Sequence, residues 1–245
     1  MTRQIASEVR MSSEIFEMPQ YVIDRVMAKR GRLHVFEALK PEETAFAVID
    51  MQNAFVKGKV KAETALAIMP TINALAAKVR ALGGRVAWVQ LAAGDEDGNS
   101  IAELYHKYFF TEQGADGHRS SLTPGEWGYE VCDELDVHDG DIKAWKSRHS
   151  AFVPGHGNLH EQLQAVGIKN LLIGGTVTNF CCETTGRDAM MLDYRAVMVS
   201  DCCAARFPED HSAGLTTFFQ SFGDVYTADE VQGVLAKGAE LGAST

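Results

Sequence analysis

The sequence predicts a single three-layer α/β/α domain built on a mostly parallel, Rossmann-like sheet. Short apolar segments, which are typical of strands buried in a parallel sheet, alternate with longer amphipathic segments, which are typical of helices. This alternation favours right-handed strand–helix–strand connections that cover both faces of the sheet. A chain of 245 residues is long enough for one such domain with a sizeable core.

Six apolar segments are the expected strands. The first covers residues 44–50 and is apolar up to its last residue, Asp50. The other expected strands are residues 85–91, 141–146, 168–173, 195–200 and 225–227. We expect the strand at 168–173 to stop at Gly174 and Gly175, because glycine is unfavourable inside a strand.

Helices are expected between these strands. The expected helices are residues 62–82, a short one after the turn residues 124–131, 158–166, a segment from about 178 to 192, 209–222, and 228 to about 241. Residues 51–58, 147–157 and 201–205 read as loops. Residues 92–125 are rich in Gly, Asp, Ser and aromatic residues and predict a long irregular binding loop or lid. The aromatic side chains of this stretch either line a pocket or anchor the loop.

The chain divides into an N-terminal arm, residues 1–40, and the α/β domain, residues 41–245. Apolar residues in the arm, from Ile15 to Met27, have roughly helical spacing. The apolar and aromatic content of the arm argues against disorder. We expect the arm to be helical and to pack on the core or on a neighbouring subunit.

Composition excludes several classes of function. The formal net charge of −10 argues against nucleic acid as a partner. No apolar run approaches the roughly 20 residues of a membrane span, and the first residues lack an apolar signal core. The five cysteines, two pairs of them adjacent, form neither a disulfide framework nor a zinc motif, so a reducing cytoplasm is the expected location.

Three reactive side chains come at or just after the ends of expected strands: Asp50, Lys146 and Cys181. The carboxyl ends of parallel strands meet at one edge of a sheet, so these side chains can converge. Thr178 and Asn179 can cap a helix that places Cys181 in its first turn, where the helix dipole favours a thiolate and the backbone N–H groups bind an oxyanion. Alternatively, Asp50 is a cap, Lys146 a solvated strand end, and Cys181 with Cys182 a small apolar pair.

These residues lie in motifs that resemble the isochorismatase-like cysteine hydrolase superfamily, which includes nicotinamidases, N-carbamoylsarcosine amidases, ureidoacrylate amidohydrolases and biuret hydrolases. The matching segments are VIDMQNAF (48–55), PGEWG (124–128), KSRHSAF (146–152) and GTVTNFCCETTGRDA (175–189), with DCCA (201–204) and FGDV (222–225) also similar. The resemblance covers about residues 43–234. It leaves the N-terminal arm outside.

The resemblance implies a role for each motif residue. It makes Cys181 the nucleophile, Asp50 the general base and Lys146 the third catalytic residue. It also implies a cis peptide bond between Thr176 and Val177, and an oxyanion hole formed by the backbone N–H groups of Val177 and Cys181. The family generally forms dimers or tetramers, so a homodimer or homotetramer is expected.

Two features depart from the family pattern. Cys182 stands where the family usually has an aliphatic residue, and we interpret it as a packing residue. The nicotinamidase branch binds a metal through an Asp-x-His pattern after the second strand, whereas residues 91–98 here contain no histidine. We therefore expect no metal, no other cofactor and no nicotinamidase activity.

The leading hypothesis is a metal-independent cysteine amidohydrolase that cleaves the C–N bond of a small amide, carbamoyl or ureido substrate through a thioester, releasing ammonia or an amine. The alternatives are a vinyl-ether hydrolase of the isochorismatase type and a catalytically silent relative that serves as a binding or scaffold protein. Intact Cys181 argues against the vinyl-ether hydrolase, which needs no cysteine, and intact Asp50, Lys146 and Cys181 together argue against the silent relative. The candidate substrate-binding residues are Gln52, Phe55, Gln90, Trp127, Arg148 and Phe152, with Asn53 and His149 on the same loops.

Overall fold

The computed structural model describes residues 16–58, 61–62, 64–95 and 97–243. Its sheet has six parallel strands in the order β3-β2-β1-β4-β5-β6, which confirms the predicted fold class. The strands are β1 (Thr44–Ile49), β2 (Arg85–Leu91), β3 (Ile142–Lys146), β4 (Asn170–Thr176), β5 (Arg195–Ala204) and β6 (Asp224–Tyr226). In this order, the strand that ends before Asp50 lies at the centre of the sheet.

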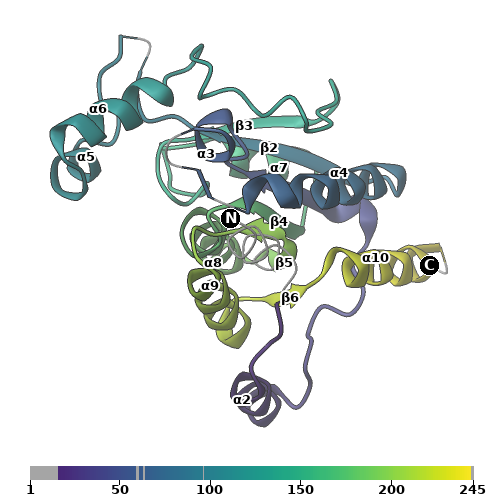
Figure 1. Cartoon of the computed structure of the whole chain (residues 1–245). Coiled ribbons are helices and arrows are strands. Elements are labelled where there is room, and N and C mark those ends of the chain that lie inside the picture. The colour runs from purple at the N-terminus through teal and green to yellow at the C-terminus, as the bar shows by residue number, and fades with distance from the viewer. Residues whose placement is uncertain (1–15, 59–60, 63, 96, 244–245) are drawn as a thin grey trace, which may run out of the picture.

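Helices cover both faces of the sheet (Figure 1). On one face of the sheet, the core contains strand residues together with residues of α4 (Ala65–Ala81) and α10 (Ala228–Ala243). The core on the other face contains residues of α2 (Gln20–Arg30), α7 (Leu159–Ala165), α8 (Glu183–Met191) and α9 (Pro208–Ser221). Among the described residues, no helix is long and apolar enough to cross a membrane.

The described part of the N-terminal arm is attached to the domain of the same chain. Val22 and Val26 of α2 are buried in the second core, and the Lys29 ammonium donates to Gln220 O of α9 at 3.2 Å. Further along, the buried Asp224 carboxylate accepts hydrogen bonds from the Val35 and Phe36 N–H groups at 2.8 and 2.7 Å. The first part of the expected arm helix, up to Ile15, lies outside the described residues.

The expected irregular stretch 92–125 contains two helices, so that part of the prediction is wrong. They are α5 (Glu103–Phe109) and α6 (Glu112–Ser121), and they stand to one side of the sheet (Figure 1). The Thr111 hydroxyl caps α6 by accepting from the Gly114 N–H at 3.2 Å. This threonine, followed by Glu112, is the sequence signal that indicates the helix.

Two other expectations differ from the structure. Residues 124–131 lead into turns instead of a short helix, and the short helix α3 (Asn53–Val56) occupies the expected loop after β1. The N–H groups of Asn53 and Ala54 donate to the carbonyls of Glu130 and Gly128, so the two segments hold each other in place. Such pairing between distant segments leaves no local pattern in the sequence.

Strand β4 runs through Gly174 and Gly175 to Thr176, so these glycines do not end it as predicted. Gly175 has a φ of +110°, and a Cβ atom added there would lie 2.0 Å from the Ile49 carbonyl oxygen. The glycines therefore allow β1 and β4 to approach closely just before Asp50. Strand β5 likewise extends to Ala204, beyond the expected end at Ser200, because its last residues pair with Gly175 and Thr176.

Replacing Gly175 by alanine is expected to lower the free energy of unfolding by about 2 kcal/mol or more, because the added methyl group meets fixed backbone atoms. Chemical denaturation followed by circular dichroism measures this change. Gly233→Ala in α10, where no atom lies within 4 Å of the added Cβ, is the matched control and is expected to be neutral or slightly stabilising. Equal stability of the two variants would contradict the close-approach argument.

Candidate active site

Asp50, Lys146 and Cys181 meet at the carboxyl edge of the sheet. The Lys146 Nζ atom lies 2.8 Å from Asp50 Oδ2 and donates to Cys181 Sγ at 3.3 Å. It also donates to the Arg148 carbonyl at 3.1 Å. Asp50 and Lys146 are 1% and 0% exposed, and Cys181 is 6% exposed. The ammonium group therefore connects the carboxylate to the sulfur in a site closed to bulk water.

The end of β1 fixes Asp50 in an unusual backbone conformation. Its φ is +50°, which is rare for a residue other than glycine and is typical of functional positions. The Asp50 N–H donates to the Val89 carbonyl of β2, and the Thr176 hydroxyl of β4 donates to the Asp50 carbonyl at 3.0 Å. Both neighbouring strands thus hold the carboxylate toward Lys146.

The segment before Cys181 differs from the expected capped helix. A π-helical turn, η2 (Thr178–Cys182), precedes α8, and no side chain caps it. The Thr178 hydroxyl instead shares a 2.9 Å hydrogen bond with His211 Nδ1, and the buried Asn179 Oδ1 has no hydrogen-bond partner among the described residues. The prediction that Thr178 or Asn179 caps a helix is therefore wrong, although Cys181 does lie at the start of the helical segment.

The backbone ahead of Cys181 contains a cis peptide bond between Thr176 and Val177. Among the hydrogen bonds of the described residues, none uses the Val177 N–H as a donor. Cys182 is fully buried, and its sulfur points to the Gly174 carbonyl at 3.8 Å. Cys182 therefore packs into the core next to the nucleophile candidate.

Burial dominates the electrostatics of the site. It raises the pKa of the Cys181 thiol, and the Asp50 carboxylate raises it further, although Lys146 acts in the opposite direction. The pKa of Asp50 is also raised by burial, which Lys146 only partly offsets. For Lys146, burial lowers the pKa, but the attraction of Asp50 and Cys181 outweighs it and the pKa is raised. Burial and Asp50 therefore oppose formation of the Cys181 thiolate, whereas Lys146 favours it.

Several candidate substrate-binding residues use their polar groups inside the protein. The Gln52 amide donates to the carbonyls of Leu91 and Tyr129, and its oxygen accepts from the Leu91 N–H. The Gln90 amide donates to the Tyr129 carbonyl at 2.9 Å. Arg148 Nη1 donates to the Ile101 and Ser147 carbonyls, both at 2.7 Å. These three side chains hold loops together around the site.

The aromatic candidates are dispersed. Phe152 is buried in the core with Tyr194, at a centroid distance of 5.5 Å. Phe55 packs on the small apolar cluster formed by Ala54, Leu91, Ala93 and Leu122. Trp127 is 61% exposed, and its carbonyl accepts from the Asn53 amide. Of these three rings, only Phe152 shares a core cluster with Cys181 among the described residues.

The residues that do approach Cys181 are different. His149 Nδ1 lies 3.6 Å from Cys181 Sγ. The His149 ring meets Tyr105 of α5 edge to face at 5.0 Å and stacks on Phe180 at 5.7 Å. Two histidines of the same region, His106 and His118, face each other at 2.9 Å between Nε2 and Nδ1. The stretch 92–125 therefore places one aromatic side chain, Tyr105, beside His149.

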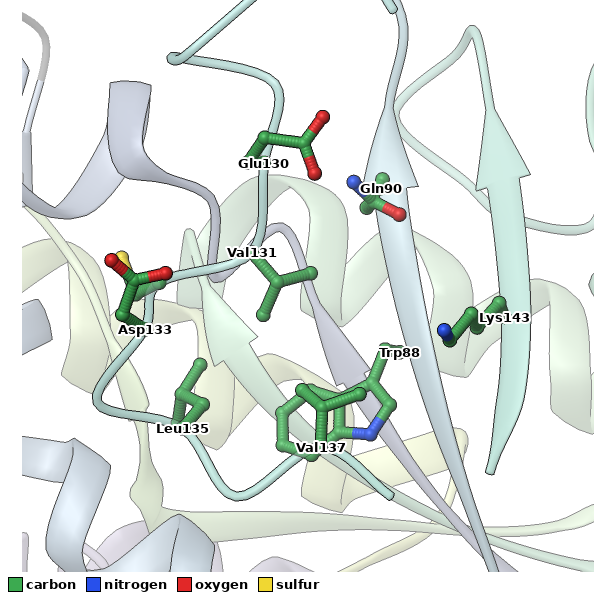
Figure 2. A pocket seen from close by; sticks show the side chains of 9 residues that line it. Trp88, Gln90, Glu130, Val131, Asp133, Leu135, Val137 and Lys143 are labelled. Carbon is green, nitrogen blue, oxygen red and sulfur yellow. The ribbon is translucent and has the colours of Figure 1, made fainter. Parts of the chain in front are cut away.

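A separate cavity of about 390 Å³ lies beside β2 and β3 (Figure 2). Its walls include Trp88, Gln90, Glu130, Asp133 and Lys143. It contains neither Asp50, Lys146 nor Cys181, so its size alone does not make it the reaction site. Of the candidate substrate-binding residues, only Gln90 lines it.

A parallel α/β sheet with buried Asp, Lys and Cys side chains at its carboxyl edge is the architecture of a hydrolase. Residues 44–230 match the isochorismatase domain family, and the chain belongs to this family. This confirms the predicted family resemblance and the prediction of a hydrolase.

Individual relatives agree with this assignment. The ureidoacrylate amidohydrolase RutB of Agrobacterium fabrum is 31% identical over 227 residues, which cover 83% of this chain and 94% of that protein. The structure of a cysteine hydrolase from Pseudomonas syringae pv. phaseolicola matches with a TM-score of 0.70 and 27% identity, covering 82% of this chain and 95% of that chain. The N-carbamoylsarcosine amidase structure from Thermoplasma acidophilum matches with a TM-score of 0.61 and 25% identity, covering 76% and 97%.

Proposed function

We propose that the protein is a metal-independent cysteine amidohydrolase that cleaves the C–N bond of a small amide, carbamoyl or ureido substrate. The observation that carries this proposal is the contact of Lys146 Nζ with both Asp50 Oδ2 and Cys181 Sγ, at 2.8 and 3.3 Å. A nucleophile, a base and an orienting cation within one buried group are the parts that covalent acyl transfer needs.

In the proposed mechanism, Cys181 attacks the substrate carbonyl as Asp50 takes the thiol proton. Because burial raises the pKa of the Cys181 thiol, proton transfer to Asp50 accompanies the attack in this mechanism. The N–H groups of Val177 and Cys181 hold the tetrahedral oxyanion. Asp50 then returns its proton to the leaving amine, and water hydrolyses the thioester. Lys146 orients Asp50 and Cys181 and stabilises negative charge on either group.

The ureidoacrylate and N-carbamoyl substrates named for two relatives favour a ureido or carbamoyl group as the site of attack. Gln52 and Arg148 donate their hydrogen bonds to backbone carbonyls, so in this proposal they hold the walls of the site instead of binding substrate. Phe152 also supports the site indirectly, because it packs in the core below it. His149, which approaches Cys181 Sγ, and its neighbours Tyr105 and Phe180 support a substrate contact on this side of the site.

The proposal also covers the location of the enzyme, its number of subunits and its partners. We expect a cytoplasmic homodimer or homotetramer that acts on a small molecule without a metal, another cofactor, nucleic acid or a membrane. Light scattering of the full chain would measure the number of subunits. Because Val22 and Val26 are buried against the domain, a truncation before Lys40 is expected to lose stability as well as any contact between subunits.

The proposed activity is tested by ammonia or amine release from a panel of small amides: ureidoacrylate, N-carbamoyl amino acids, biuret, maleamate and nicotinamide. We expect release from a carbamoyl or ureido member, unaffected by chelator and abolished by iodoacetamide. Loss of activity with chelator would overturn the metal-free mechanism. No release from any member, together with inert Cys181, would favour a silent binding protein, and isochorismate cleavage would favour the vinyl-ether alternative.

A further inference from the structure

The sheet is incompletely covered at its β3 edge. β3 is the last strand in the order, and the helix that packs on it, α7, lies on one face of the sheet. On the opposite face, residues 130–137 run beside β2 and β3 without forming a helix and leave the cavity of about 390 Å³ (Figure 2). Parallel sheets are normally covered by helices on both faces. This end of the sheet therefore has a face that the described residues leave partly open.

The centre of this open face is apolar. Strand pairing sets Trp145 of β3 opposite Gln90 of β2, which lines the cavity, so Trp145 lies on the same face of the sheet. Trp145 is 41% exposed, and Val137, which also lines the cavity, is 37% exposed. Exposed tryptophan side chains of this kind are typical anchors of protein–protein interfaces.

Charged side chains of both signs surround this apolar centre. Glu130 and Asp133 lie on the wall formed by residues 130–137, and Lys143 lies across from them on β3 (Figure 2). All three residues are exposed, and none of their charged groups forms an ion pair or a hydrogen bond with another described residue. An apolar centre within a polar rim is the usual anatomy of a protein interface.

Backbone hydrogen bonds fix the wall in place. The Asn53 N–H donates to the Glu130 carbonyl at 2.9 Å, and the Cys132 N–H donates to the Met51 carbonyl at 3.0 Å. The wall is thereby joined to the segment that follows β1. A face that is already formed loses little conformational entropy when a partner docks on it.

We propose that a second copy of this chain docks on this face through a twofold axis. Opposite charges on opposite sides of one apolar centre make the face self-complementary, because the axis brings Lys143 to the partner subunit's Glu130 and Glu130 to the partner subunit's Lys143. A partner of uniform charge would meet a like charge on one side. The inference rests on the homo-oligomer proposed above, to which it assigns a surface, and is independent of the amidase chemistry.

Charge reversal tests this pairing without removing the apolar centre. Lys143→Glu and Glu130→Lys each bring like charges together, and each is expected to weaken self-association by about tenfold or more. The double variant Lys143→Glu/Glu130→Lys restores opposite charges and is expected to recover association. Trp145→Ala removes the central side chain and is expected to weaken association while leaving all charges in place. Sedimentation equilibrium at low ionic strength, where screening is weakest, measures these changes.

The matched control is Lys237→Glu, which makes the same change in charge on an exposed position of α10, a helix that packs on β5 and β6. It should associate like the wild type, and circular dichroism checks the fold of every variant. A monomeric wild type would overturn this inference together with the proposed oligomer. An oligomeric wild type whose association is unchanged by Lys143→Glu and Trp145→Ala would overturn the surface alone. Association that stays weak in the double variant would overturn the pairing of Lys143 with Glu130.

Discussion

Replacement of Cys181 by alanine is expected to lower kcat/KM for the amide substrate by about 10⁴-fold or more, because no other group can form the thioester. Cys181→Ser is expected to lose most of the activity as well. Removing one buried sulfur leaves only a small cavity, so the protein should keep its fold. Steady-state kinetics, with circular dichroism as a check of folding, measures both effects.

The neighbouring cysteine supplies the control for this prediction. Cys182 is also buried, but its sulfur faces the Gly174 carbonyl and takes no part in the proposed chemistry. Cys182→Ala is expected to keep kcat/KM within a few-fold of the wild type. Retention of more than a tenth of the activity in Cys181→Ala would contradict covalent catalysis by this residue.

The elements that hold the three central side chains were accessible from the sequence. A continuous buried segment marks β1, and a shorter segment that mixes apolar residues with lysines marks β3; the parallel arrangement brings the ends of such strands to one edge. Asp50 and Lys146 stand at these ends, so their meeting follows from topology. The strand pattern misled where Gly174 and Gly175 continue β4, because close packing on β1 outweighs the low strand propensity of glycine.

The surroundings of the site were less accessible. Gln52 and Arg148 have side chains suited to substrate recognition, but their hydrogen bonds are taken by carbonyls of distant loops. No local sequence pattern shows that a polar side chain forms its hydrogen bonds with a distant loop. Tyr105 reaches His149 because α5 and α6 fold beside the sheet, and the signal for α6 is a single capping threonine. His149 itself lay within a recognised motif, yet only its 3.6 Å contact with Cys181 gives it a role.

Lys146→Met is expected to lower the free energy of unfolding by about 3–5 kcal/mol, because it leaves the Asp50 carboxylate buried without its cation. The double variant Asp50→Asn/Lys146→Met is expected to recover most of this loss, since the buried charge is gone and the shapes are similar. Denaturant unfolding of the wild type, both single variants and the double variant gives the coupling energy. Simple addition of the two single effects would contradict a direct interaction. All three variants are expected to lose amidase activity. The double variant should therefore be stable but inactive, which distinguishes the effect on function from the effect on stability.

The pH dependence of Lys146→Met provides an independent check. A carboxyl group whose pKa is raised in the folded protein lowers its stability fully above that pKa, and the penalty shrinks as pH falls from there toward the pKa of the unfolded chain. Burial already raises the pKa of Asp50, and removal of Lys146 takes away the main opposing effect. The stability difference from the wild type should therefore shrink toward acidic pH. Lys57→Met, which breaks the exposed 2.7 Å pair with Glu134, is the control and should change stability far less than Lys146→Met, because solvent screens an exposed ion pair.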